Sequence, residues 1–469
     1  MRVLLINQFY PPDPAATGQL LADLAEELAN QRHDVHVICS RCMYAGGRIV
    51  ESQSRTITDK SDRKDPYCSD NQVNPRIHRV GGTAFGHRHF AGQLLDQISF
   101  YVMAAHAAMR LPAVDVCVAL TSPPFVGLIG AALKMLRKSP LILWTMDLYP
   151  QIAAALGLIN SDGLLHRILA RLSSILYRQA SYVIAIGQIM TEHLIEAGSQ
   201  PDKVVTIHNW TPGECVKPMR SGESPLRNEY GVGEKVAIMY SGNMGPGHEL
   251  HTIVQALQRI RHKEMIRVIF SGDGKSRQNL QRSVRKHRLG FVAFFPQVPL
   301  KRLSDHLAAG DIHIVSQARG TEGLMVPSKL YGVMAAGRPT LFVGPACCEA
   351  AMIVKASNCG FVVEPGDIHG AVTALERLVS DAQLRQAMGD SAQAFYQANF
   401  GRDRSLARIV KLIKAIAAQA TSHPEPCSQE QPQHEPLSRK GYRRALRHSA
   451  RCQPDRPAAC TSLESQQGP

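Results

Sequence analysis

The strongest constraint on the fold is a repeated alternation between short apolar runs and longer segments with helical periodicity. Residues 2–7 form an apolar run that ends at Asn7, residues 19–31 place leucines on one helical face, and residues 34–39 form a second apolar run. Continuous apolar runs of this length are typical of strands buried on both faces of a parallel sheet. The order therefore predicts a β-α-β unit with a right-handed crossover.

The same alternation continues through most of the chain and predicts an α/β protein. Helices are expected at residues 89–110, 164–177 and 402–418. Further strands are expected in a first group at residues 114–119, 141–145, 182–186 and 204–207, and in a second group at 236–241, 266–271, 313–316 and 340–343. Two groups of this kind predict two Rossmann-like, doubly wound domains.

The length of 469 residues also favours two domains over a single core. We expect a first Rossmann-like domain at residues 1–208, a linker rich in Pro, Gly and charge at 209–232, a second domain at 233–400 and a final amphipathic helix at 401–420. Residues 421–469 are poor in large aliphatic side chains, which predicts a disordered tail. Residues 43–74 are polar and aperiodic, which predicts a long mobile loop or lid.

The charge balance favours anionic partners. Lys and Arg number 53 against 39 Asp and Glu, for a net charge of +14, which is suited to phosphates or an acidic lipid surface. No basic stripe interleaved with aromatic residues is present, so nucleic acid is not expected as a partner. No signal-peptide core or membrane-spanning run is evident, which predicts a cytoplasmic protein, either free or peripheral on the inner face of the cell membrane. Cys39-x-x-Cys42 has no matching second pair, so no metal site is expected.

Three loops at predicted strand ends are rich in glycine, where doubly wound sheets bind ligands. The loop at residues 10–18 ends in Gly18, just before a predicted helix, where backbone amides and the helix dipole attract anions. The loop at residues 241–247 and the shorter turn at 271–274 resemble phosphate nests; these contribute Gly242, Asn243, Gly245 and Asp273. The alternative is ordinary tight turns, because the G-x-G-x-x-G spacing of a dinucleotide site is missing.

The densest motif lies at residues 321–339, after the predicted strand at 313–316. Ser328 is expected as the N-cap of a helix, which would direct free amides, its hydroxyl and the Lys329 ammonium towards the strand ends. A diphosphate there would be held by charge and by the helix terminus together. Glu322, on the preceding loop, is placed to accept hydrogen bonds from sugar hydroxyls. The alternative is a capped helix with a solvated lysine and a surface glutamate.

Asp147 is the candidate catalytic carboxylate of the first half. It follows the predicted strand at residues 141–145 within the segment Trp144-Thr-Met-Asp-Leu-Tyr-Pro150. A carboxylate at a strand end can orient or deprotonate an acceptor hydroxyl. An Asp in this position can equally cap the next helix, and the pattern alone leaves both interpretations open.

Taken together, these motifs resemble the family-4 retaining glycosyltransferases of the GT-B fold, from Met1 to about Ala418. The likeness is carried by Tyr10-Pro-Pro with Gly18, Asp147-Leu-Tyr-Pro150, Tyr240-Ser-Gly-Asn-Met-Gly245, Gly272-Asp-Gly274, Val326-Pro-Ser-Lys-Leu-Tyr331 and Ala335-Ala-Gly-Arg-Pro339. The last two motifs look like the subgroup that builds bacterial surface polysaccharides such as lipopolysaccharide, including fucosamine- and fucose-transferring members.

The resemblance implies two facing Rossmann-like domains, with the acceptor held by the first and a nucleotide diphosphate sugar by the second. It implies a retaining, hexosyltransferase-type reaction that needs no metal and no cofactor besides the donor. Asp147, Glu322 and Lys329 are the expected catalytic residues. The expected donor-binding residues are Gly18, Gly242, Asn243, Gly245, Asp273, Ser328 and Tyr331. A polyprenyl-diphosphate-linked or other glycan is the expected acceptor, and the final helix is expected to return to the first domain.

Two departures from the family pattern keep other functions open. Many members have two glutamates separated by seven residues, but the second place here is Leu330. Many also have Arg and Lys in the glycine turn, where this chain has Asn243 and His248. The alternatives are a nucleotide-sugar epimerase or hydrolase on the same fold, or a non-catalytic protein that binds nucleotide sugars. A nicotinamide-dependent oxidoreductase is a more distant alternative, because no dinucleotide fingerprint is present.

Overall fold

The first half of the chain forms a seven-stranded parallel sheet in the computed structural model, which describes residues 1–41, 74–83, 90–211, 216–219 and 222–421. The strand order is β3-β2-β1-β4-β5-β6-β7. The predicted lid at residues 43–74, except for its last residue, and the predicted tail, except for Thr421, lie outside the described residues. The strands are β1 Arg2–Ile6, β2 Asp34–Ser40, β3 Arg76–Val80, β4 Val116–Leu120, β5 Leu141–Trp144, β6 Tyr182–Ala185 and β7 Val204–Thr206.

The second half forms a six-stranded parallel sheet in the order β10-β9-β8-β11-β12-β13. Both sheets therefore run outward in two directions from their first strand, which is the doubly wound arrangement of Rossmann-like folds. The strands β10 and β13 are additions to the predicted set. The strands are β8 Val236–Ser241, β9 Ile266–Ser271, β10 Val292–Phe295, β11 Ile312–Ser316, β12 Thr340–Val343 and β13 Gly360–Val363.

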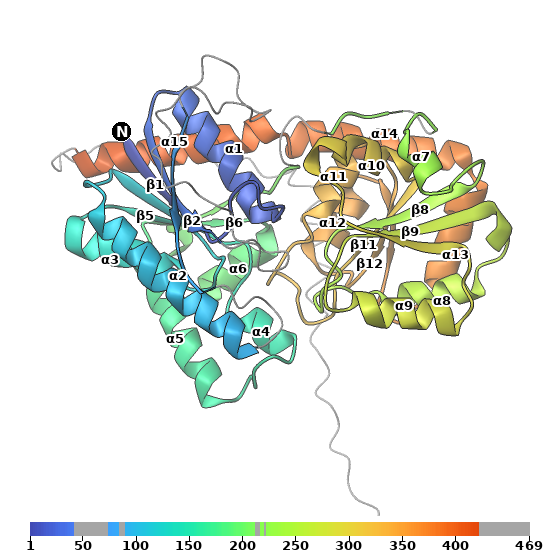
Figure 1. Ribbon diagram of the computed structural model, residues 1–469, viewed down its shortest axis with the longest axis horizontal. Helices are drawn as coiled ribbons and strands as arrows, with labels where there is room; N and C mark the ends of the chain where they lie inside the picture. Colours follow the sequence, from blue (N-terminus) through green and yellow to red (C-terminus); the bar gives the residue numbers. More distant parts are fainter. Residues whose placement is uncertain (42–73, 84–89, 212–215, 220–221, 422–469) are drawn as a thin grey trace, which may run out of the picture. The chain divides into compact units, whose positions relative to one another are not determined.

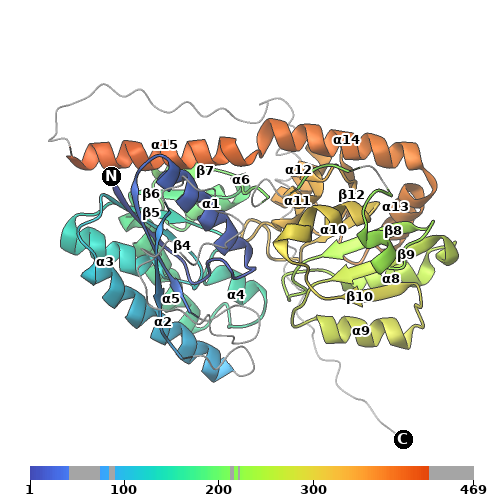
Figure 2. The same cartoon turned by 45° about the horizontal axis from the view of Figure 1, so that its top comes forward.

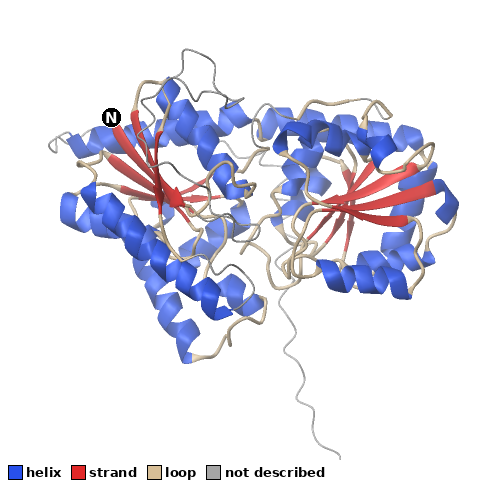
Figure 3. Ribbon diagram, in the orientation of Figure 1, coloured by secondary structure: helices blue, strands red, loops and turns tan. Residues whose placement is uncertain are grey.

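Helices cover both faces of each sheet (Figure 3). In the first half they are α1 Ala16–Asn30, α2 Phe90–Arg110, α3 Gly127–Arg137, α4 Gln151–Ala155, α5 Leu164–Gln179 and α6 Gln188–Glu196, with η2 Pro201–Lys203. In the second half they are α7 Leu226–Glu229, α8 His251–Arg259, α9 Arg277–Lys286, α10 Leu303–Ala309, α11 Lys329–Ala335, α12 Glu349–Ala356, α13 Ile368–Ser380, α14 Ala382–Asn399 and α15 Arg402–Thr421, with η3 Lys263–Met265 and η4 Leu300–Arg302.

The strands are apolar runs because both faces of each sheet are covered. Every residue of β4 and β5 is buried, and Leu4 and Leu5 of β1 are also fully buried. Burying each such side chain contributes about 1.5–3 kcal/mol of transfer free energy. Among the described residues, no helix is both long enough and apolar enough to cross a bilayer.

The last helix, α15, packs against α1 and β4 of the first sheet, whereas α14 packs against α11 and α13 of the second half (Figure 2). Ile409 and Ile413 of α15 are fully buried in the same apolar cluster as the first sheet. Arg402 Nε lies 3.3 Å from Asp23 Oδ1, and the Trp210 indole donates to Asp23 Oδ2 at 2.7 Å. The chain therefore returns to its first half after completing the second.

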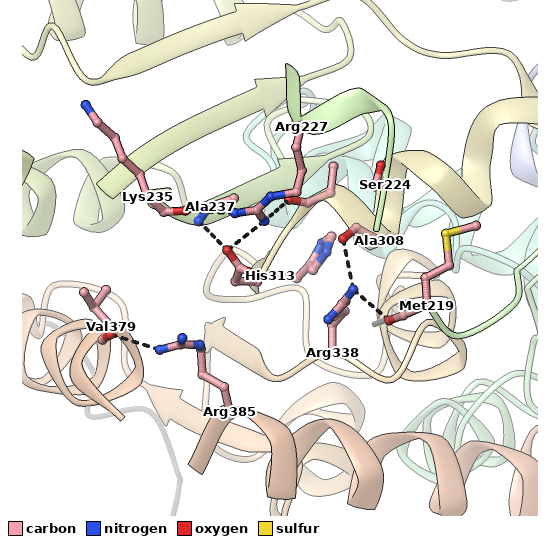
Figure 4. A network of polar contacts seen from close by, with 12 residues as sticks. Met219, Ser224, Arg227, Lys235, Ala237, Ala308, His313, Arg338, Val379 and Arg385 are labelled. Atoms are coloured by element: carbon pink, nitrogen blue, oxygen red, sulfur yellow. Dashed lines mark hydrogen bonds and ion pairs between the residues drawn. The ribbon is translucent and has the colours of Figure 1, made fainter. Parts of the chain in front are cut away.

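Two arginines attach the predicted linker to the second sheet (Figure 4). Arg227 Nη1 donates to Asp311 Oδ2 at 3.0 Å. Arg338 Nη2 donates to the carbonyl oxygens of Met219 and Ala308, each at 3.0 Å. The Arg338 side chain is buried, and a buried guanidinium requires such acceptors. The described residues of the predicted linker therefore include a docked segment and a short helix, α7.

Candidate functional site

The candidate site lies where the strand order of the second sheet reverses, between β8 and β11. Crevices at such switch points are the usual ligand sites of doubly wound sheets. Two contacts join the glycine turn after β8 to the loop after β11. Ala318 N donates to Gly247 O at 3.0 Å, and the His248 ring lies 2.8 Å from the Ser316 carbonyl oxygen through Nδ1. The two loops therefore form one continuous surface.

Lys329, the first residue of α11, directs its ammonium at the glycine turn after β8. Its Nζ donates to Tyr240 Oη, lies 3.5 Å from Asn243 O and is 3.9 Å from the centroid of the Tyr240 ring. A Cβ on Gly242 would lie 3.6 Å from the same Nζ. The lysine is therefore held over the turn by an aromatic ring and a backbone carbonyl.

The Lys329 ammonium contacts the hydroxyl and the ring of Tyr240 and the carbonyl oxygen of Asn243. None of these described partners is a carboxylate. Burial lowers the pKa of Lys329 to about 7, because desolvation disfavours the charged form. Burial, with a smaller contribution from Lys329, also lowers the pKa of His248 to about 3. His248 is therefore neutral at physiological pH and adds no positive charge at this turn.

The two glycine turns approach so closely that side chains are excluded between them. Gly272 has a φ of +126°, and a Cβ there would lie 2.2 Å from Gly242 O. Met244 N donates to the carbonyl oxygen of Asp273 at 2.7 Å. Asn243 covers the turns, since its side chain lies within 3.0 Å of a Cβ built on Gly245. Gly242, Asn243, Gly245 and Asp273 thus lie together at the ends of β8 and β9.

Asp273 faces its own turn. The Asp273 Oδ1 accepts from Gly274 N at 2.8 Å, which is the local side-chain to backbone bond typical of Asp in turns. The side chain is otherwise exposed. Its contribution to the site is therefore to shape the second glycine turn.

Ser328 occupies the N-cap position of α11, but its hydroxyl makes no capping hydrogen bond. Its backbone is already helical, with φ −58° and ψ −23°, whereas a capping Ser usually has extended backbone angles. The predicted cap is therefore wrong. The Ser328 side chain is partly exposed.

The loop that carries Glu322 contacts the segment that carries Asp147. Leu148 N donates to Leu324 O at 2.9 Å, and Asp147 and Met325 form an isolated antiparallel bridge. Glu322 Oε1 accepts from Gly320 N at 3.1 Å. The segment of Asp147 in the first half and the loop of Glu322 in the second half, which the sequence analysis considered separately, are therefore in contact.

Asp147 is held at its strand end by a hydroxyl. Its backbone N donates to Thr121 Oγ1 at 3.2 Å, and Met146 N donates to the same oxygen at 2.9 Å. Burial raises the pKa of Asp147 to about 6. The alternative role as a helix cap is not observed, because the cap position of α4 is Pro150 and no side chain caps that helix.

Two predicted site residues face the protein interior. Gly18 lies inside α1 instead of before it, and a Cβ there would lie 3.0 Å from the Phe9 carbonyl carbon, so its smallness serves close backbone packing. Tyr331 is fully buried and makes an edge-on contact with Phe400 at 5.1 Å between ring centroids. The Tyr331 side chain therefore belongs to the core, and its predicted role in donor binding stays a prediction.

Sequence reasoning overlooked two residues that organise the site. Tyr240 positions Lys329 and donates its own hydroxyl to Asn243 O at 2.8 Å. Thr121 holds the segment of Asp147 from the end of the neighbouring strand. Tyr240 is the penultimate residue of β8, and Thr121 directly follows β4. This position at a strand end was the signal in the sequence that could have identified each residue.

Comparisons with known proteins agree with this architecture. "Probable glycosyltransferase WbjE" of Pseudomonas aeruginosa is 27% identical over 312 residues, which cover 65% of this chain and 76% of WbjE. "Putative colanic acid biosynthesis glycosyl transferase WcaI" of Escherichia coli is 23% identical over 383 residues, 80% of this chain and 92% of WcaI. The structure of Anabaena HepE in complex with UDP and glucose superposes with a TM-score of 0.65 at 18% identity, covering 88% of this chain and 100% of HepE.

Family models match both halves of the chain. The model described as "Glycosyl transferase 4-like domain" matches residues 16–210, and the model described as "Glycosyl transferases group 1" matches residues 225–395. The matches include the segment of Asp147 in the first half and the glycine turns with Lys329 in the second. This chain therefore belongs to the family-4 glycosyltransferases of the GT-B fold.

Proposed function

We propose that this glycosyltransferase moves a sugar from a nucleotide diphosphate sugar to a hydroxyl of a lipid-linked glycan during synthesis of a bacterial surface polysaccharide. The main support for this proposal is the position of Lys329 over the glycine turn after β8. An ammonium that has no carboxylate partner in the described part of the chain, set over closely packed backbone turns, suits a diphosphate in charge and in shape. The UDP and UDP-glucose complexes of HepE and the name of WcaI support the donor and the pathway respectively.

The chemistry follows from where charge develops. The bond between the anomeric carbon and the diphosphate oxygen breaks, its electron pair leaves with the diphosphate, and the acceptor oxygen bonds to the same carbon. The Lys329 ammonium and the backbone amides of the Gly242 turn stabilise the leaving diphosphate. Asp147, across the contact with Met325, orients the acceptor hydroxyl and receives its proton.

In this proposal, Glu322 binds the sugar of the donor. Its carboxylate lies on the loop that runs from β11 to Lys329, and one oxygen is already bonded to Gly320 N at 3.1 Å. The remaining lone pairs can accept hydrogen bonds from sugar hydroxyls. We propose further that the reaction retains the anomeric configuration and needs no metal, since protein groups supply the positive charge.

Donor binding by a Lys329→Met variant tests the proposal. In calorimetry with UDP-glucose and other nucleotide sugars, we expect the wild type to bind one donor best. The variant should bind that donor about tenfold to a hundredfold more weakly, because it lacks a hydrogen bond from a charged group. Wild-type affinity should fall as pH rises through about 7, where Lys329 loses its proton, and the variant should not show this fall.

Lys355→Met is the matched control, because Lys355 is exposed on α12 of the same half. It should bind the donor as the wild type does. Equal donor affinity in the wild type and in Lys329→Met would overturn the assignment.

Three further measurements test the rest of the proposal. Turnover with and without EDTA tests whether a metal is needed. NMR of the product's anomeric proton tests retention of configuration, and product analysis in lipid extracts tests the acceptor class.

A further inference from the structure

A chain of three polar side chains leads from the interior of the second half to the glycine turn after β8. Ser241, the last residue of β8, has its Oγ 2.8 Å from Nε2 of His306 on α10. On the other side of the ring, His306 Nδ1 lies 2.7 Å from Oη of Tyr230, which directly follows α7. His306 and Tyr230 are buried, whereas Ser241 is partly exposed. The reaction described above uses none of these three groups.

The chain reaches the turn from the face of the second sheet that carries α10. In Figure 1, α7 and α10 lie on one face of this sheet, and α8 and α9 lie on the opposite face. Successive side chains of a strand point to opposite faces, so Tyr240 and Ser241 leave β8 in opposite directions. The two residues before Gly242 therefore supply a phenol bonded to Lys329 on one face and a hydroxyl on the other.

Burial determines where the protons of this chain lie. Burial lowers the pKa of His306 to about 3, so at physiological pH the neutral ring has one N–H donor and one acceptor nitrogen. Burial raises the pKa of Tyr230 to about 12, so its hydroxyl keeps its proton. Within the described chain, His306 is the sole hydrogen-bond partner of that hydroxyl. Because a buried donor without an acceptor is costly, the Tyr230 hydroxyl donates to His306 Nδ1.

This assignment leaves the proton of Ser241 free. With Nδ1 as acceptor, the ring hydrogen is on Nε2 and is donated to Ser241 Oγ. The Ser241 hydroxyl then cannot donate to the ring, and in the part of the chain that the structure describes it contacts no other acceptor. The opposite tautomer would use the Ser241 proton on His306 and leave the buried Tyr230 proton without an acceptor. Each hydrogen bond of a chain polarises the next, which makes the Ser241 hydroxyl a stronger donor.

Aromatic packing holds Tyr230 in place and links it to the second glycine turn. Its ring packs on Phe295 with 4.5 Å between centroids and lies edge-on to His306 at 5.7 Å. The carbonyl oxygen of Phe295 accepts from Gly272 N at 3.1 Å. The chain therefore contacts the strand beside one glycine turn and ends in a hydroxyl beside the other.

We propose that Ser241 donates a hydrogen bond to a phosphate oxygen of the nucleoside diphosphate in the donor, and that His306 and Tyr230 are positioning residues for this proton. The inference rests on the proposed function, because it requires a nucleoside diphosphate at the Gly242 turn. The oxygens of an ionised diphosphate are acceptors, whereas a serine hydroxyl can donate or accept. His306 occupies the acceptor side of this hydroxyl and leaves only its proton, as such a ligand requires.

Calorimetry with the best nucleotide sugar and with its free nucleoside diphosphate tests this assignment. Ser241→Ala should bind both ligands about three- to tenfold more weakly than the wild type, because one hydrogen bond is lost. Tyr230→Phe should also weaken binding, because His306 can then take up the Ser241 proton. The double variant should bind like Ser241→Ala, since the phenol acts through the serine. Additive losses, or a loss confined to the nucleotide sugar, would overturn the proposal.

The tautomer of His306 is a second readout, which a purely structural role would not fix. In protein labelled with ¹⁵N-histidine, the ring of His306 is identified as the signal that changes in Tyr230→Phe. At neutral pH the wild type should have its ring hydrogen on Nε2 and none on Nδ1. A ring hydrogen on Nδ1, in a neutral or a charged ring, would contradict the proposed direction of the chain.

Ser357→Ala is the matched control for loss of a serine hydroxyl. Ser357 is buried in the same half, and its Oγ donates to Ile353 O of α12 at 2.8 Å. This variant should bind both ligands as the wild type does. A wild type that binds neither ligand would overturn the proposed function together with this inference. Wild-type binding that Ser241→Ala leaves unchanged would overturn this inference alone.

Discussion

Lys329 and Asp147 have pKa values shifted towards neutrality for the same physical reason. Both side chains are half-buried, and the partial loss of water disfavours the charged form of each. The pKa of Lys329 falls to about 7, and that of Asp147 rises to about 6. Shifts of this kind are common at functional sites, and here they bring both pKa values close to neutral pH.

The raised pKa of Asp147 predicts that activity falls on the acidic side of the pH profile, which is its acidic limb. As pH falls through about 6, Asp147 becomes protonated and can no longer accept a proton, so kcat/KM for the acceptor should fall. Asp147→Asn should lose this limb and reduce kcat by about 10²–10⁴-fold. The measurement is kcat/KM between pH 5 and 8 with the confirmed donor.

Glu26→Gln is the control for this profile. Burial also raises the pKa of Glu26, but that side chain belongs to α1 and not to the segment that carries Asp147. The acidic limb should persist in Glu26→Gln. An unchanged limb in Asp147→Asn would show that another group titrates in this range.

At the scale of elements, the two glycine turns act as one unit because their backbones touch. Gly242 N donates to Ser271 O at 2.9 Å, and Ser276 N donates to Met244 O at 2.9 Å. The ends of β8 and β9 are thus tied together before any ligand binds. A site built in this way spends little free energy on ordering its loops when the diphosphate arrives.

Gly272→Ala should disrupt this unit. The new Cβ would lie 2.2 Å from Gly242 O, at a φ of +126° that L-residues avoid. We expect a loss of at least about 1–3 kcal/mol in the free energy of unfolding, with donor affinity reduced as the Gly242 turn is displaced. Chemical denaturation and calorimetry measure the two effects.

Gly290→Ala is the corresponding neutral change. Gly290 has open space where a Cβ would lie, so stability and donor affinity should stay within error of the wild type. If Gly272→Ala behaved in the same way, the close approach of the two turns would be wrong.

At the scale of the whole molecule, a buried carboxylate connects the two halves. Glu349, at the start of α12, is 2% exposed. Its Oε2 accepts from Gln188 N at 2.9 Å and from Ile189 N at 3.4 Å, at the N-terminus of α6. Helix N-termini favour negative charge. A Cβ on Gly187 would lie 2.8 Å from the Glu349 carboxyl carbon, so no side chain fits beside this contact.

Glu349→Ala should weaken the connection between the halves. It leaves two partly buried amides without their acceptor, which costs about 1–3 kcal/mol in the free energy of unfolding. Glu349→Gln keeps an acceptor oxygen and should lose less. Glu234→Ala, at an exposed position, is the control and should unfold like the wild type. A thermal unfolding temperature in Glu349→Ala equal to that of the control would contradict this role.

The sequence by itself determined the fold class, the strand-end loops and the ends of most strands. This was possible because strands buried on both faces must be apolar, and because the turns after them need glycine wherever backbones approach. The strands Arg76–Val80, Val292–Phe295 and Gly360–Val363 escaped prediction. They are edge strands with partly exposed residues, so burial shaped their composition less strongly.

Tertiary structure alone decided which side chains face the site. The motif suggested Ser328, Lys329 and Tyr331 together, but the rotation of α11 directs Lys329 to Tyr240 and buries Tyr331 against Phe400. Composition cannot determine this rotation, because it depends on how the helix packs on its neighbours. The contact of Asp147 with Met325 likewise forms only when both halves are folded, since it joins segments that are distant in the chain.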